Sequence, residues 1–140
     1  MNNPVVRGIL GVLAGMVAAI AVVFVVEGAG HALFPPPAGL DITDPVDQER
    51  LVAWMPASVK AIVVLGWFLG SFAGATTAMK ISRRALPGWI VAAAMVALSV
   101  ATTLMFPHPA WMIGAAAILP LVAAWLAARL VARRTASSLQ

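Results

Sequence analysis

Hydrophobic residues fill four long segments of this chain, and each segment is long enough to cross a membrane as a helix. We place them at 5–32, 58–79, 86–106 and 110–131. A bilayer core about 30 Å thick takes about 20 helical residues, and none of the segments alternates as a barrel strand would. Lipid offers no hydrogen-bond partners to an open backbone, so the pattern predicts an all-α bundle of four membrane-spanning helices forming one domain over 1–140.

The polar positions gather mainly between the first two spans, in the loop 33–57. Asp44, Pro45 and Asp47 are typical of a helix N-terminus, because they supply an N-cap, a first-turn proline and an acid near the positive helix end. An apolar stripe at helical spacing follows and includes Trp54. We therefore expect a short interfacial helix on the outer membrane face, which is either a plain connector or a lid over a polar site.

The composition agrees with a membrane protein. The chain has 140 residues, of which 62% are hydrophobic and 10% charged, and its mean hydropathy is +0.98. Such a chain has too little polar surface for a soluble globule. The net charge of +4 comes from bases at the ends of apolar segments, which argues against a nucleic-acid partner. The absence of cysteine excludes disulfides, thiolate metal sites and thiol redox chemistry.

The positions of the bases predict the orientation in the membrane. Lys and Arg near the ends of spans are retained on the cytoplasmic side. With the N-terminus inside, only Arg50 and Lys60 lie outside, and all five acids and both histidines lie on or near the outer face. We therefore expect both termini in the cytoplasm. The inner set comprises Arg7, Lys80, Arg83, Arg84, Arg129, Arg133 and Arg134.

Glycines recur at four-residue spacing on two of the spans. The first span carries Gly11 and Gly15, and the second carries Gly66, Gly70 and Gly74. Small residues at this GxxxG spacing let two helix backbones approach closely in lipid. The spacing predicts helix packing, either within the chain or between copies, and we expect a homo-oligomer or a larger membrane complex.

Five polar residues of the spans and their outer connections lie at a similar predicted depth. Glu27 and His31 are four residues apart, so their side chains share one helix face. Ser99 and Thr103 lie in the outer third of the third span, and His108 follows it. A carboxylate near lipid is costly unless it is paired, hydrated or neutralised. We therefore predict an outer ligand or proton site formed by these five residues.

The chemistry of this site has several interpretations. The Glu27–His31 pair anchors the outer interface, or it handles protons, because histidine titrates near neutral pH. Two imidazoles and a carboxylate also make a ligand set that zinc or another divalent metal accepts, with His108 as the third member. No HExxH motif or close third ligand accompanies the pair. Haem is not favoured, because His108 lies between two prolines.

Catalytic motifs receive little support from the sequence. There is no tyrosine, the serines and threonines lack an acid–base partner at a motif spacing, and no glycine-rich phosphate loop follows a strand. We therefore favour a non-enzymatic accessory or ligand-binding subunit. The alternatives are a small oligomeric transporter or channel linked to protons or cations, and a divalent-metal-dependent membrane enzyme.

A resemblance to known proteins rests mainly on the segment from Gly30 to Asp41. It reads Gly-His-x-Leu-Phe-Pro-Pro-Pro-Ala-Gly-Leu-Asp and is followed by an acidic helix and the glycine-rich second span. In these features, and in the Phe-Pro-His-Pro turn at 106–109, the chain resembles small four-span bacterial membrane proteins of unassigned activity. The resemblance implies a four-helix fold in the bacterial inner membrane and supplies no reaction, cofactor or site.

Overall fold

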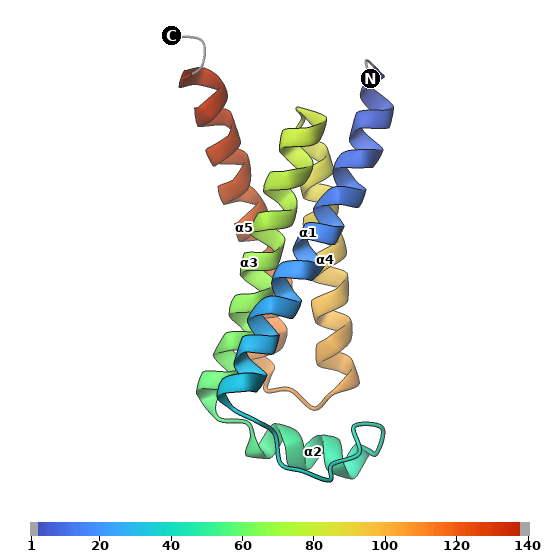
Figure 1. The fold of residues 1–140 in the computed structure, drawn as a ribbon, viewed down its shortest axis with the longest axis vertical. Coiled ribbons are helices and arrows are strands. Elements are labelled where there is room, and N and C mark those ends of the chain that lie inside the picture. The colour runs from blue at the N-terminus through green and yellow to red at the C-terminus, as the bar shows by residue number, and fades with distance from the viewer. Residues whose placement is uncertain (1–2, 138–140) are drawn as a thin grey trace.

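The computed structural model describes residues 3–137, and from residue 134 onwards only the backbone. This part of the chain contains five helices and no strand (Figure 1). Four of them, α1, α3, α4 and α5, are long and apolar enough to cross a membrane, so the predicted all-α membrane bundle is confirmed. The helices are α1 Pro4–Leu33, α2 Pro45–Trp54, α3 Ala57–Ser82, α4 Leu86–Met105 and α5 Ala110–Ser137.

Side-chain caps fix the starts of α1 and α2. Asn3 accepts a hydrogen bond from the backbone N–H of Val5 at 2.9 Å, and a proline follows the cap. Asp44 accepts from the backbone N–H of Val46 at 2.8 Å, and Pro45 follows it. Each cap satisfies one backbone donor that the helix itself leaves unpaired. The short helix between the first two spans therefore begins where the sequence pattern places it.

The glycines of α1 and α3 lie where these two helices pack against each other. A Cβ atom at Gly11 would lie 2.8 Å from the carbonyl oxygen of Ala78, and one at Gly15 would lie 2.7 Å from that of Gly74. Real Cβ atoms essentially never come within 3.0 Å of such a neighbour. The close backbone approach is thus made within one chain, and a second copy of the protein would have to dock on another surface.

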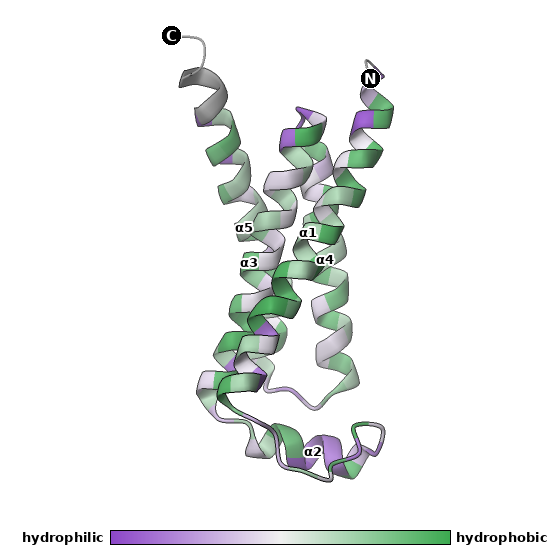
Figure 2. Ribbon diagram, in the orientation of Figure 1, coloured by the Kyte–Doolittle hydropathy of each residue, from purple (hydrophilic) through white to green (hydrophobic). Residues whose placement is uncertain are grey.

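Helices α3 and α4 form the middle of the bundle, because each packs against all the other spans, whereas α1 and α5 make no contact within the described residues. The interior is built mainly from small residues, which allow close helix packing in lipid. Large apolar side chains point outward instead: Phe24 is 73% exposed and Leu104 is 75% exposed. Figure 2 shows hydrophobic residues along the long helices, with the most hydrophilic residues concentrated toward their ends and in α2.

The two ends of the bundle carry opposite charges. The start of α1, the end of α5 and the α3–α4 turn lie at one end (Figure 1), which we call the basic end. At the opposite end, α2 lies across the bundle. We call this the acidic end, because it holds all five acidic residues of the sequence. The bases at the basic end include Arg7, Lys80, Arg83 and Arg84, and the acids at the acidic end are Glu27, Asp41, Asp44, Asp47 and Glu49.

Candidate functional site

The side chain of Glu27 lines a groove between α1 and α4, near the acidic end. The groove has a volume of about 180 Å³. Two hydroxyl side chains of α4 and one tryptophan of α3 share it with Glu27, and the remaining lining is apolar. We call it the Glu27 groove; its lining residues are Ile20, Val23, Phe24, Glu27, Trp67, Met95, Leu98, Ser99 and Thr102.

The packing of α1 on α3 determines where Glu27 lies. A Cβ atom at Gly66 would lie 3.8 Å from Cγ of Glu27 and 3.5 Å from a methyl carbon of Val26. The aliphatic stem of Glu27 therefore crosses α3 at a glycine, where no side chain competes for the space. This contact leaves the carboxyl group at the edge of the α1–α3 interface, in the groove that α4 borders.

The polar atoms of the Glu27 groove are mainly hydrogen-bond acceptors. The hydroxyl of Ser99, a residue only 2% exposed, donates to the carbonyl of Met95 at 2.7 Å. The hydroxyl of Thr102 donates to the carbonyl of Leu98 at 3.0 Å. A hydroxyl has one proton to donate, so only its lone pairs remain available.

The Glu27 carboxyl group makes no hydrogen bond or salt bridge with any side chain in the described part of the chain. Apart from the indole of Trp67, the polar side chains of the Glu27 groove are thus a carboxyl group and two hydroxyls, whose oxygens accept rather than donate. A ligand that donates hydrogen bonds complements this lining.

His31 is close to Glu27 but faces a different space. Its Nδ1–H donates to the backbone carbonyl of Glu27 at 2.9 Å, so the neutral ring carries its free lone pair on Nε2. The imidazole lies within electrostatic range of the Glu27 carboxylate. However, it lines a separate pocket of about 170 Å³ beneath α2, together with Phe34, Pro36, Pro37, Leu40, Ile42, Leu51, Trp54, Met55 and Val59.

His108 lies in the connection between α4 and α5. Its Nδ1–H donates to the backbone carbonyl of Phe106 at 3.1 Å, and the two rings meet edge to face with centroids 6.1 Å apart. His108 lines neither the Glu27 groove nor the pocket at His31. Among the described residues, no group of three His, Asp or Glu side chains is placed to hold a metal ion. The structure therefore does not bring Glu27, His31 and His108 together as a ligand set.

The hydroxyl residues of α4 divide between the groove and the helix interior. Thr103 is buried and donates to the carbonyl of Val100 at 2.7 Å, and it does not line the groove. Thr102, which follows Ser99 at i+3, lines the groove instead. The polar spacing of α4 points equally to both threonines, whereas no sequence signal distinguishes Trp67 from the other apolar residues of its span.

A chain of hydrogen bonds folds the loop before α2 onto that helix. The hydroxyl of Thr43 donates a hydrogen bond to the carboxylate of Asp41 at 2.7 Å, and the backbone N–H of Thr43 donates another at 2.9 Å. These two bonds, the first more than the second, lower the pKa of Asp41 below its ordinary value. The backbone N–H of Asp41 in turn donates to Asp47 at 3.1 Å, and Arg50 donates to the same carboxylate group at 3.0 Å. These bonds hold one wall of the pocket at His31.

The fold and the groove define a small polytopic helical membrane protein with a polar groove between its spans. Comparison of the chain with protein families, with curated proteins and with solved structures gives no match. Its function therefore has to be inferred from the arrangement of its side chains.

Proposed function

We propose that this protein is a non-enzymatic membrane protein that binds a small organic cation in the Glu27 groove. The supporting observation is the acceptor lining: a carboxyl group without a bonded side-chain partner, beside two hydroxyls whose protons are already donated to carbonyls. A carboxylate at this depth needs a compensating charge or a proton. An ammonium group supplies both positive charge and hydrogen-bond donors.

The size and the aromatic lining of the groove favour a small cationic group. The volume of about 180 Å³ lies below the range of about 300–1,000 Å³ that is usual for drug-sized ligands. Phe24 and Trp67 line the same space, and aromatic faces attract cations. Glu27 lies six residues before the end of α1 at Leu33, which is about 9 Å along the helix. An ammonium group there leaves its apolar part in the membrane.

The binding experiment uses the purified protein in mild detergent, with methylammonium and ethylammonium as probes, because both carry a positive charge and N–H donors. We expect each probe to raise the melting temperature, followed by tryptophan fluorescence, by about 4 °C at about ten times its dissociation constant. Glu27→Gln should abolish this shift. Glu49→Gln is the matched control, because it removes the same charge from an exposed residue outside the groove. Equal shifts in all three proteins would refute the proposal.

The same carboxyl group favours a second candidate function, the transport of protons or cations. A carboxyl group in a span that has no bonded side-chain partner is free to exchange protons. Proteoliposomes with a pH-sensitive dye inside test this candidate: proton flux that is lost in Glu27→Gln and kept in Glu49→Gln would establish transport in place of simple binding. A pull-down from mild detergent tests the accessory role, in which the protein is retained with a larger membrane complex.

We further propose that the protein resides in a bacterial inner membrane with both termini in the cytoplasm, as a member of the four-span group that it resembles. The excess of bases at the basic end supports this orientation. The chain has no cysteine, so single-cysteine variants report topology directly. In intact cells an impermeant maleimide should label Glu49→Cys and leave Lys80→Cys unlabelled. The reverse labelling pattern would show that both termini lie outside the cytoplasm.

A further inference from the structure

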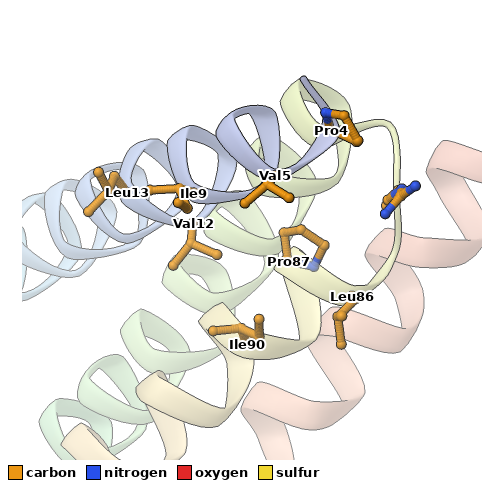
Figure 3. Close-up of a pocket in the computed structure, with 10 residues that line it drawn as sticks. Pro4, Val5, Ile9, Val12, Leu13, Leu86, Pro87 and Ile90 are labelled. Carbon is orange, nitrogen blue, oxygen red and sulfur yellow. The ribbon is translucent and has the colours of Figure 1, made fainter. Parts of the chain in front are cut away.

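A second groove lies at the basic end, between the first turns of α1 and α4 (Figure 3). Its volume is about 370 Å³, twice that of the Glu27 groove. Nine of its ten lining residues are apolar, and the tenth is an arginine. We call it the basic-end groove; it is lined by Pro4, Val5, Gly8, Ile9, Val12, Leu13, Arg84, Leu86, Pro87 and Ile90.

The groove exists because small and rigid residues line it where α1 and α4 diverge. A Cβ atom at Gly8 would meet only Cγ of Pro87, at 4.0 Å, so the glycine leaves space between the helices. Figure 3 shows Val5 of α1 and Pro87 of α4 facing each other across that space. Val5 is 65% exposed and Leu86 is 67% exposed, so the groove opens to the surroundings of the bundle.

The length of the groove matches one leaflet of a membrane. Its lining on α1 runs from Pro4 to Leu13, a span of ten residues whose nine steps rise by about 14 Å. Half of a hydrocarbon core about 30 Å thick is about 15 Å. An extended acyl chain anchored at the basic end therefore has apolar side chains along its whole path.

Positive charge surrounds the mouth of the groove. The backbone N–H of Arg84 donates to Oγ of Ser82 at 3.3 Å, which holds the α3–α4 turn and places Arg84 at the mouth. The guanidinium of Arg7 donates to the carbonyl of Ile81 at 2.9 and 3.2 Å, so a second positive charge is fixed close to this turn. None of the five acidic side chains lies at this end.

We propose that the basic-end groove binds one acyl chain of an anionic phospholipid whose phosphate pairs with Arg84. Charge complementarity favours this occupant over a helix of a second copy. A second copy inserted in the same orientation would bring its own basic end to the groove, and like charges would face each other. An anionic phosphate instead accepts hydrogen bonds from the planar guanidinium group.

The test is native mass spectrometry of the full chain, released from mild detergent after incubation with phosphatidylglycerol and phosphatidylcholine of identical acyl chains. We expect one phosphatidylglycerol to be retained in preference to phosphatidylcholine. Arg84→Gln should lower that retention about fivefold, as expected for one basic residue facing anionic lipid. Lys80→Gln is the matched control, because it removes the same charge at the same end from a residue that does not line the groove.

A second variant tests the acyl-chain part of the site. Ile90→Trp fills the groove from an exposed position, so it should lower retention of phosphatidylglycerol while leaving the melting temperature unchanged. Glycerol phosphate, which has the headgroup chemistry without the chains, should not be retained.

Three results would overturn the proposal. Equal losses of retention in Arg84→Gln and Lys80→Gln would mean that the surface charge alone attracts the lipid. Retention of phosphatidylglycerol that Ile90→Trp leaves unchanged would place the lipid elsewhere. A dimer that Ile90→Trp abolishes would make the groove an interface between copies.

Discussion

Substituting alanine for Gly15 tests the close packing of α1 on α3 directly. In an exposed helix, Gly→Ala is stabilising by about 1 kcal/mol, because glycine loses more conformational freedom on folding. At Gly15 the new Cβ would lie 2.7 Å from the carbonyl oxygen of Gly74 and 3.0 Å from side-chain carbons of Ala78 and Val91. The neighbours on two helices block the movement that would relieve these contacts.

The structure also supplies the scale of the effect. Overpacking of a tightly packed site costs about 1–3 kcal/mol. Gly28 lies on the same helix with nothing within 4 Å of its Cβ position, so Gly28→Ala should show only the gain of helix propensity. We expect Gly15→Ala to be less stable than Gly28→Ala by about 2–4 kcal/mol. Gly66→Ala should resemble Gly28→Ala, because its nearest neighbour would be at 3.5 Å, which is an ordinary van der Waals contact.

The assay is reversible unfolding of the purified variants in mixed micelles of mild detergent and dodecyl sulfate, followed by far-ultraviolet circular dichroism. The free energies of unfolding of the three variants are compared with that of the unmodified chain under identical micelle compositions. If Gly15→Ala is as stable as Gly28→Ala, then α1 and α3 do not approach as closely as the structure shows, and the reasoning fails.

Two further predictions concern the loop and α2. The pKa of Asp41 lies below its ordinary value of 3.8 because of its two bonds from Thr43. The ionised carboxylate of Asp41 thus stabilises the loop above pH 3.8, and this stability is lost as the pH falls through the lowered pKa. The protection of the Thr43 backbone N–H against hydrogen exchange, measured relative to its intrinsic rate at each pH, should therefore fall in acid, and an unchanged profile in Thr43→Val would contradict this cause. Asp44→Ala removes the N-cap of α2 and should destabilise that helix by about 1 kcal/mol, seen as faster exchange at Val46.

The four spans could be predicted from the sequence because uninterrupted apolar segments of their length have few alternatives. Their ends could not be predicted as well. The last span is expected to end at residue 131, whereas α5 continues to Ser137. Hydropathy indicates where a helix leaves the lipid, which is not where its backbone hydrogen bonds stop. The alanines and arginines after 131 are good helix formers, so the helix continues past the apolar segment.

The sequence points to Glu27 and Ser99, two of the residues that line the Glu27 groove, because charged and hydroxyl groups stand out in apolar spans. The directions of the polar side chains could not be predicted. Glu27 and His31 are one turn apart, yet one lines the groove beside α4 and the other lines the pocket beneath α2. Depth along a helix says nothing about which neighbour lies beside it. That information depends on how the helices are rotated against one another, which is decided by tertiary packing.

The rotation of α1 about its axis follows from the row of residues through which it packs on α3. This row connects the glycines to the Glu27 groove. Stepping about 100° per residue places Glu27 far round the helix from Gly15. The two residues nevertheless belong to one row of four-residue steps, and α1 packs on α3 along such rows, as ridges in grooves do. The contacts advance from Gly15 beside Gly74 to Ala19 beside Gly70 and then to Glu27 beside Gly66.

The direction of Glu27 is therefore set by the glycines of α3. A Cβ atom at Gly70 would lie 2.8 Å from the carbonyl oxygen of Ala19 and 2.7 Å from a methyl carbon of Val23, and Val23 lines the Glu27 groove. Gly70→Ala should therefore weaken the thermal shift by ethylammonium as well as the fold. Gly28→Ala should leave the shift intact, since nothing packs there. If a destabilised Gly70→Ala protein keeps the full thermal shift, ligand binding in the Glu27 groove does not depend on the packing of α1 on α3, and this link is refuted.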